Sequence, residues 1–186
     1  MSNKDNQLHA ENRISASRRA FYSLQGAGLG NLKSNPNAIA YLWNAALRPV
    51  LTYGLNCMFL SKSSMSKLEK TQSSLIKASL GLHKFCRSSP ILSALDISSI
   101  SHTVDMASLG LLKQIFDNSS GAKHFYMHMV QLHSSGMLHG HSDLVSRCLQ
   151  ICSKYDISLL KFLLVDKYES ETCLSLIHIS EPTRPY

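Results

Sequence analysis

The fold class is decided by residues 63–81, SSMSKLEKTQSSLIKASLG. Apolar and small polar side chains recur in this stretch every three or four residues, a spacing that places them on one face of an α-helix. They are Met65, Leu68, Gln72, Leu75, Ile76 and Ser79. Ser63 or Ser64 can cap the start of the helix, and Gly81 is well placed to end it. The stretch therefore predicts an amphipathic helix whose lysines lie largely on the other faces.

The residues before this stretch are also helical in pattern. Residues 8–24 carry apolar side chains at loose helical spacing. Asn35 and Pro36 then supply an N-cap and a first helical residue. Pro49 lacks an amide hydrogen, so we expect a bend or a break there. Residues 50–60 are apolar on nearly all sides; their composition suits a strand, but their length and setting favour a buried second helical leg.

The second half of the chain continues the helical pattern. Ser89 and Pro90 open a short helix that runs to Leu95, and Ser98 or Ser99 caps a longer one. Weaker helical patterns follow at about 122–133, 142–154 and 158–167. No stretch shows the strict alternation of a half-buried strand. The sequence predicts an all-α fold, an irregular bundle of about six to eight helices in one body or two lobes.

Charge is distributed unevenly along the chain. Residues 1–95 contain 12 Lys or Arg and 3 acidic residues, whereas residues 96–186 contain 7 and 9, so the halves carry +9 and −2. We accordingly expect a basic helical region at 1–97 and a separate helical linker region at 98–173. A basic region suits a polyanionic partner, most often nucleic acid, although plain solubility explains the same charge.

Composition restricts the class of protein. The hydrophobic share of 44% is enough for a packed core. No apolar run is long enough to span a bilayer, and the polar first residues do not resemble a signal peptide. The five cysteines are odd in number and scattered, which favours reduced thiols over a disulfide framework. We expect an intracellular protein with no membrane partner.

Seven cations are the candidate nucleic-acid-binding residues. They are Arg18, Arg19, Lys67, Lys70, Lys77, Lys84 and Arg87. Cations spaced along helices can contact successive phosphates, and an aromatic side chain such as Tyr22 can stack on a base. The alternative for each of these cations is a solvated helix face.

The sequence favours no catalytic site of its own. It has no P-loop, no complete dinucleotide-binding glycine motif and no nucleophile elbow. Two-metal polymerase chemistry needs clustered carboxylates, whereas residues 1–95 contain only Asp5, Glu11 and Glu69. We expect the chain to be catalytically inert and to bind no cofactor.

One weaker pattern points to a metal. His124 and His128 are four residues apart on a predicted helix, as are Cys148 and Cys152. Two such pairs on facing helices could bind zinc tetrahedrally. Half-exposed histidines and core cysteines explain the same residues and are the favoured interpretation, because the spacing is loose against known zinc motifs.

Several segments together resemble a known family. They are ASRRAFYSL at 16–24, LWN at 42–44, LRPVLTYG at 47–54, KLEKTQ at 67–72, IKASLGL at 76–82 and RSSPILSAL at 87–95. These residues resemble the region that follows the polymerase palm in reverse transcriptases of non-LTR retrotransposons. The likeness is clearest over about residues 10–115 and fades after them; the Arg-Pro-x-Leu-x-Tyr-Gly segment is its most specific element.

The resemblance implies a thumb and helical linker from a larger endonuclease–reverse transcriptase polyprotein, an RNA-directed DNA polymerase. It would assign Arg18, Arg19 and the helix carrying Lys67 to Lys77 to the backbone of an RNA/DNA template–primer. The family's catalytic carboxylates and their Mg²⁺ belong to an Asp-Asp motif in the palm, and this chain contains no Asp-Asp pair. The resemblance also implies action in the cytoplasm and nucleus. The alternative is a free-standing basic helical module that binds nucleic acid or protein.

The last residues differ in character from the rest. LSLIHISEPTRPY at 174–186 resembles the translation of a transposase-type sequencing adapter, so we expect an artefactual tail. On this interpretation the natural protein continues beyond about Cys173, and Met1 is an internal methionine. The alternative is an ordinary polar tail.

Overall fold

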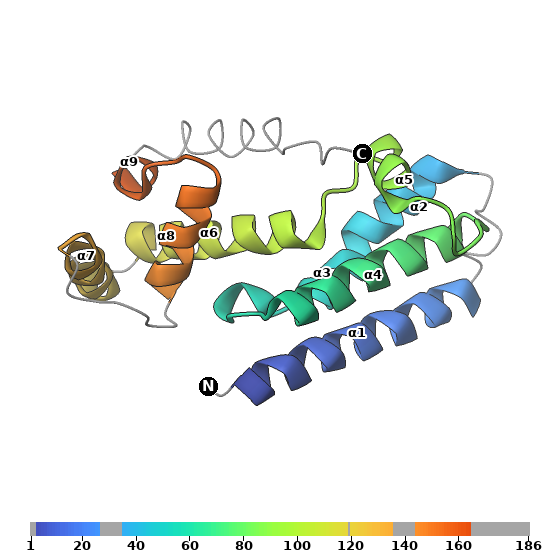
Figure 1. Cartoon of the computed structure of the whole chain (residues 1–186), viewed down its shortest axis with the longest axis horizontal. Helices are drawn as coiled ribbons and strands as arrows, with labels where there is room; N and C mark the ends of the chain where they lie inside the picture. Colours follow the sequence, from blue (N-terminus) through green and yellow to red (C-terminus); the bar gives the residue numbers. More distant parts are fainter. Residues whose placement is uncertain (1–2, 27–34, 119, 136–143, 165–186) are drawn as a thin grey trace. The chain divides into compact units, whose positions relative to one another are not determined.

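A computed structural model describes residues 3–26, 35–118, 120–135 and 144–164, and these form helices, turns and loops with no strand. The helices are α1 (Asn3–Gly26), α2 (Pro36–Leu42), α3 (Arg48–Thr52), α4 (Lys62–Ser79), α5 (Ser88–Ala94), α6 (Ile100–Asn118), α7 (Ser120–Ser134), α8 (Leu144–Lys154) and α9 (Leu159–Leu164) (Figure 1). The predicted all-α fold is confirmed. The expected artefactual tail at 174–186 lies outside the described residues.

The chain consists of two compact units, unit 1 (Met1–Val104) and unit 2 (Asp105–Tyr186). The division falls within α6, later along the chain than the predicted boundary after residue 97. Each unit has its own hydrophobic core. We therefore describe each by itself.

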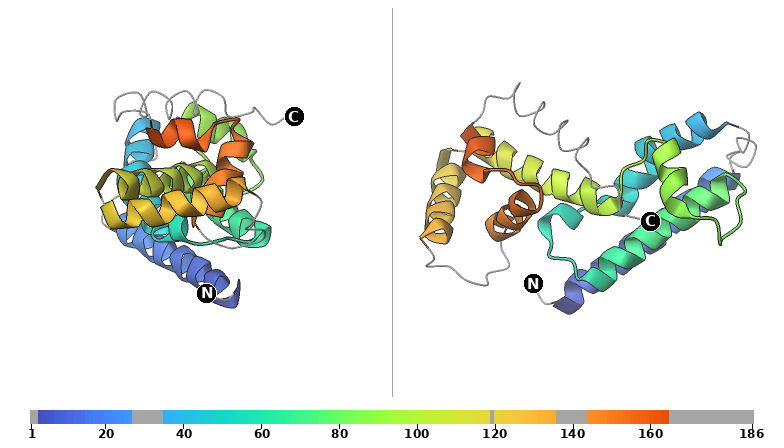
Figure 2. Two further views of the ribbon diagram at one scale, coloured as in Figure 1. Left: turned by 90° about the vertical axis from the view of Figure 1, so that its left-hand side faces the viewer. Right: turned by 45° about the horizontal axis from the view of Figure 1, so that its top comes forward.

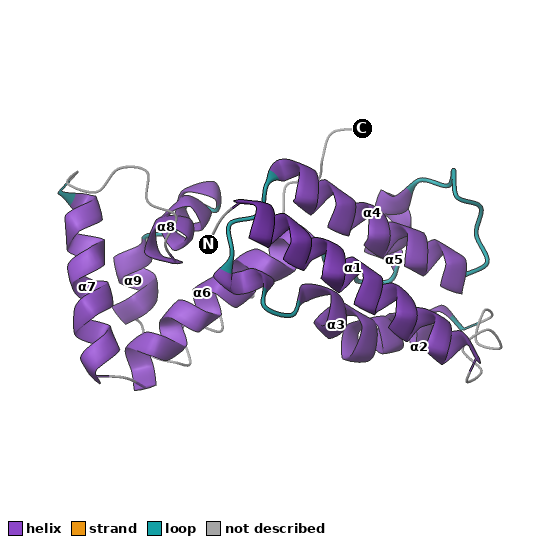
Figure 3. Cartoon of the chain, turned by 90° about the horizontal axis from the view of Figure 1, so that it is seen from below, coloured by secondary structure: helices purple, strands orange, loops and turns teal. Residues whose placement is uncertain are grey.

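The core of unit 1 forms where α1 packs against α3 and α4 (Figure 3). On α1 the buried positions recur every three or four residues, at Asn6, Ala10, Ile14, Ser17 and Phe21. They meet apolar side chains of the other helices. The fully buried members of this core include Trp43, Leu47, Leu51, Leu55, Leu68, Ile76, Ile100 and Val104. The buried stripe of α1 thus packs into a core to which α3, α4 and the first turns of α6 also contribute.

Pro49 does not break the helix, which continues from Pro36 to Thr52. Residues Trp43–Leu47, just before the proline, form a π-helical turn in which the Arg48 N–H donates to the Trp43 carbonyl. A proline ring clashes with the carbonyl four residues earlier, and it has no N–H to bond there. The wider π-turn relieves that conflict locally, so the chain stays helical.

The predicted second helical leg at 50–60 is wrong. Helix α3 ends at Thr52, Gly54 has a φ of +73°, and Leu55–Cys57 form a single 3₁₀ turn. Leu51 and Leu55 are buried, but the Tyr53 side chain is 70% exposed. The left-handed conformation at Gly54 turns the backbone out of the helix, which a glycine can do at little cost.

Two side chains of α1 hold this segment in place. The His9 Nε2 lies 3.1 Å from the Tyr53 carbonyl oxygen, and the Asn6 amide donates to the Phe59 carbonyl at 3.1 Å. A methyl group at Gly54 would stand 3.3 Å from His9 Nε2. Glycine is therefore favoured at position 54 by its backbone angle, and the close His9 side chain adds to that preference.

Helix α4 begins slightly earlier than predicted. Its N-cap is Ser61, whose hydroxyl accepts the Ser64 N–H at 3.1 Å, and Ser64 itself is buried. Its end is as predicted: Gly81 has a φ of +67°, and the Leu82 N–H donates to the Lys77 carbonyl at 2.9 Å. This is the Schellman pattern, which a glycine favours.

Two aspartates end other helices in the same way. Asp96 follows α5 with a φ of 50°, and Asp156 follows α8 with a φ of 55°. The next residue in each case, Ile97 or Ile157, donates its N–H back into the helix at 2.9 or 2.8 Å. Aspartate adopts the left-handed region more readily than most residues, so the two turns carry only modest strain.

The beginning of α6 is fixed by α4. Ser99, one of the two predicted caps, accepts the His102 N–H at 3.2 Å. The Glu69 carboxylate accepts the Ser101 N–H at 2.9 Å, and the Gln72 amide donates to the Ser98 carbonyl at 2.9 Å. A carboxylate at a helix N-terminus also interacts favourably with the helix dipole. Glu69 is thus a structural residue of unit 1.

Unit 2 contains the later part of α6 together with α7, α8 and α9. Its buried side chains are Leu109, Leu112, Phe116, Val130, Val145, Cys148, Ile151, Cys152, Leu159, Phe162 and Leu163. Helices α7, α8 and α9 agree with the three weaker predicted patterns to within a few residues. None of the helices in the described ranges combines the length and the apolar character needed to cross a membrane.

Candidate nucleic-acid interface

Helix α4 carries a row of lysines on its outer surface. Its inner face is formed by residues such as Leu68, Gln72 and Ile76, all of them buried. Lys67 and Lys70 are exposed and Lys77 is half-buried. Spacings of three and seven residues place these three lysines along one strip, with rises of about 4.5 Å and about 10.5 Å. We call Lys67, Lys70 and Lys77 the α4 strip.

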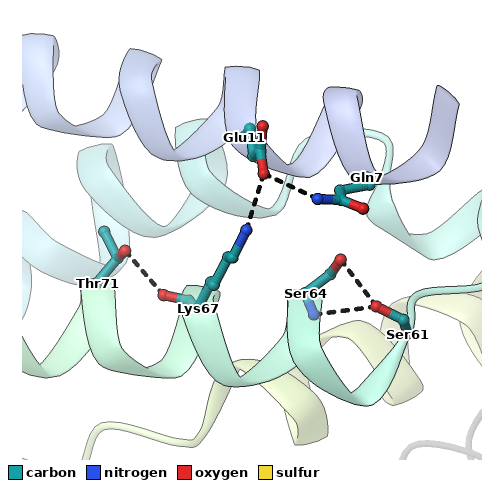
Figure 4. A network of polar contacts seen from close by, with 6 residues as sticks. All are labelled: Gln7, Glu11, Ser61, Ser64, Lys67 and Thr71. Atoms are coloured by element: carbon teal, nitrogen blue, oxygen red, sulfur yellow. Dashed lines mark hydrogen bonds and ion pairs between the residues drawn. The ribbon is translucent and has the colours of Figure 1, made fainter. Parts of the chain in front are cut away.

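Helix α1 runs parallel to α4 and beside it (Figure 2). Figure 4 shows the shared direction: Gln7 precedes Glu11 along α1 as Ser64 precedes Lys67 along α4, and Glu11 faces Lys67. Arg18 and Arg19 follow Glu11 by seven and eight residues, and Lys77 follows Lys67 by ten. Arg18, Arg19 and Lys77 therefore lie toward the C-terminal end of the pair, whereas Lys67 lies beside Glu11.

Lys67 is engaged within the fold. Its Nζ lies 2.8 Å from Glu11 Oε1, which also accepts the Gln7 amide at 3.2 Å (Figure 4). The hydrogen bonds from Lys67 and Gln7, followed by the charge of Lys67, lower the pKa of Glu11. At neutral pH the charge of Lys67 is therefore partly compensated, and a phosphate would have to compete with Glu11.

Lys77, at the end of the α4 strip, contacts the loop that follows α4. The Lys77 ammonium donates to the Lys84 carbonyl at 3.3 Å, and the Lys84 ammonium lies 5.0 Å from the centre of the Phe85 ring. Arg87 is exposed and occupies the N-cap position of α5. The structure thus joins the end of the α4 strip to the loop that carries Lys84 and Arg87.

Arg18 and Arg19 are exposed on α1, and Tyr22 lies one turn after Arg18 with 65% of its side chain exposed. The neighbouring Phe21 is buried in the core. Sequence reasoning missed a second aromatic–cation pair: the Arg13 guanidinium lies 5.5 Å from the centre of the exposed Tyr53 ring. The exposed Tyr53 ring with its adjacent cation is the combination on which single-stranded bases stack, and Tyr22 offers a second exposed ring.

Pairing of the cations differs between the units. In unit 2, Lys154 lies 2.8 Å from Asp105 and Lys113 lies 3.6 Å from Asp117. In unit 1, six of the seven candidate cations have no ion-pair partner within the described ranges. They are Arg18, Arg19, Lys70, Lys77, Lys84 and Arg87. Uncompensated positive charge is therefore concentrated in unit 1.

The proposed zinc ligands are not brought together. His124 and His128 are exposed on α7, whereas Cys148 and Cys152 are buried on α8. The Cys148 thiol lies 3.6 Å from the Ser108 carbonyl, and burial raises the pKa of Cys152 to about 11. No group of three or more His, Cys, Asp or Glu suited to a metal occurs in the described ranges. The two cysteines act as core residues.

Comparison with protein families, curated proteins and solved structures gave no match to this chain. Its function has to be inferred from its own residues. The geometry offers exposed cations without ion-pair partners on two parallel helices and on the loop after α4, where the Lys84 ammonium lies beside the Phe85 ring.

Proposed function

We propose that unit 1 is a thumb-type element that grips the sugar–phosphate backbone of a template–primer duplex. The observation that carries the proposal is the α4 strip, which lies parallel to the arginines of α1 and ends at the loop with Lys84 and Arg87. A row of cations attracts the phosphates of a nucleic acid, and binding releases the counterions of those phosphates. Contacts of this kind depend little on base sequence. The expected duplex is an RNA–DNA hybrid.

The wider proposal places this chain within a non-LTR retrotransposon reverse transcriptase. It is supported by the resemblance of about residues 10–115, and the preference for glycine at position 54 gives its most specific segment a physical reason. On this proposal the catalytic carboxylates and Mg²⁺ belong to a palm elsewhere in the parent polyprotein, and this chain has no catalysis of its own. The parent would act in the cytoplasm and nucleus.

A salt titration tests the backbone grip. We expect the full chain to bind a labelled RNA–DNA hybrid with an affinity that falls steeply between about 50 mM and about 200 mM salt. Fluorescence anisotropy measures the affinity at each salt concentration. Binding whose affinity hardly changes with salt would contradict the proposal.

Charge reversal distinguishes this function from a protein-interaction module. The triple variant K67E/K70E/K77E should lose most hybrid binding while its helical circular dichroism is retained. Unchanged hybrid binding in a folded triple variant would favour the module. Because Lys67 pairs with Glu11, the double variant K70E/K77E is the control that leaves this ion pair intact.

A further inference from the structure

The loop between α4 and α5 contains a turn, His83 to Cys86, that is closed by hydrogen bonds. The Cys86 N–H donates to the His83 carbonyl at 3.0 Å, and the Phe85 N–H donates to His83 Nδ1 at 3.4 Å. The Lys77 ammonium ties the turn to α4 through the Lys84 carbonyl. The side chains on this turn are therefore presented in a defined arrangement.

Phe85 lies near the tip of the turn, and 79% of its side chain is exposed. The His83 ring lies 5.0 Å away between ring centres, and the Lys84 ammonium lies 5.0 Å from the Phe85 ring centre. Single exposed apolar side chains are common, so exposure alone indicates little. The surroundings of Phe85 are what distinguish it: an aromatic neighbour, an adjacent cation and an ordered backbone.

The charged side chains in the sequence around the turn are all positive. The sequence from Lys70 to Leu95 contains Lys70, Lys77, Lys84 and Arg87 but no Asp or Glu. Arg87 is exposed and has no ion-pair partner in the part of the chain that the structure describes. The turn therefore combines an exposed ring with uncompensated positive charge, and it continues directly from the α4 strip.

We propose that this turn binds an unpaired nucleotide: the base stacks on Phe85, and Lys84 and Arg87 contact the phosphates on either side of it. A base has an apolar ring face and an adjoining phosphate, which match the ring and the cations of the turn. This proposal rests on the proposed function in one respect, since a polyanion lying along the α4 strip would reach the turn. It adds a site for single-stranded RNA or DNA next to the duplex grip.

The test uses the full chain and a short single-stranded oligonucleotide containing 2-aminopurine, in RNA and DNA forms. We expect F85A to weaken binding about tenfold, the usual effect of losing one stacked base. F85A should also abolish the 2-aminopurine fluorescence change that reports stacking. F85W, which keeps an aromatic ring, should retain both the affinity and the fluorescence change. The matched control is F125A, since Phe125 on α7 is also exposed, at 60%.

Two outcomes would overturn the proposal. F85A could bind the oligonucleotide as the unmodified chain does, or F125A could weaken binding as much as F85A.

A blunt RNA–DNA hybrid separates this site from the duplex grip. If the hybrid fails to bind but the oligonucleotide still requires Phe85, the proposed thumb function fails and the nucleotide site stands. If the hybrid binds through the α4 strip and F85A has no effect on the oligonucleotide, only the nucleotide site is overturned.

Discussion

At the scale of single residues, two observations disfavour a side chain at Gly54. Its φ of +73° is a conformation that other residues rarely adopt, and an added Cβ would stand 3.3 Å from His9 Nε2, so the His9 side chain would have to shift. We expect G54A to destabilise the fold by about 1–3 kcal/mol, the usual cost of a strained backbone position. Thermal unfolding followed by circular dichroism measures this. Gly110, within α6 and with open space at its Cβ, is the control: G110A should be neutral or stabilising, and equal losses in both variants would contradict the account.

The cysteines should differ sharply in reactivity. Cys57 is exposed, whereas Cys148 and Cys152 are buried, and burial raises the pKa of Cys152 to about 11. The thiolate is the reactive form, so Cys152 should resist alkylation as long as the pH stays below that value. Mass spectrometry after brief iodoacetamide treatment should find Cys57 modified and the α8 pair protected. Rapid labelling of Cys152 in the folded chain would show that the core of unit 2 is not formed as described.

The raised pKa of Cys152 also makes the stability of the fold depend on pH. Because the folded thiol holds its proton more tightly than the unfolded thiol, its contribution is fully present below the ordinary cysteine pKa. The contribution is lost as the pH rises through about 11.

At the scale of elements, the start of α6 depends on a side chain of α4. The Glu69 carboxylate accepts the Ser101 N–H at 2.9 Å. E69A should cost about 0.5–2 kcal/mol, comparable with the loss of an N-cap. E69Q keeps an acceptor but loses the charge, so it should cost less. Urea unfolding of both variants checks this order, and an E69A variant as stable as the unmodified chain would contradict the capping role.

The Glu11–Lys67 pair should limit binding of the α4 strip. The lowered pKa of Glu11 keeps its carboxylate ionised at neutral pH. The ion pair is lost only as the pH falls through that lowered pKa. E11Q therefore releases Lys67 at neutral pH. We expect tighter hybrid binding and a salt dependence steeper by about one unit of slope. D156N, the same charge change on an exposed residue of unit 2, is the control, and it should have little effect.

At the scale of the whole molecule, helical periodicity predicted most of the fold. Buried stripes with spacings of three and four residues identified α1, α4 and α6, because each helix buries one face. Position-specific backbone features were harder to predict. The π-turn before Pro49 and the left-handed aspartates at 96 and 156 depend on local compensation that no hydrophobic pattern records.

The candidate interface was predictable only in part. Composition located the basic residues, but it could not show that Lys67 is paired with a glutamate 56 residues away in sequence. Pairing across that separation depends on α1 and α4 running parallel, which is a property of the tertiary structure. The sequence alone does not single out Phe85 either, because its exposure follows from the turn that carries it.

The most direct test of the central claim compares K70E with K123E in hybrid binding. Lys70 and Lys123 are exposed helical lysines of units 1 and 2, and either reversal lowers the formal net charge from +7 to +5. If the α4 strip grips the backbone, K70E should weaken binding several-fold and reduce the salt slope by about one, while K123E leaves both nearly unchanged. Equal losses in the two variants would show that overall charge governs binding and would contradict an interface on α4.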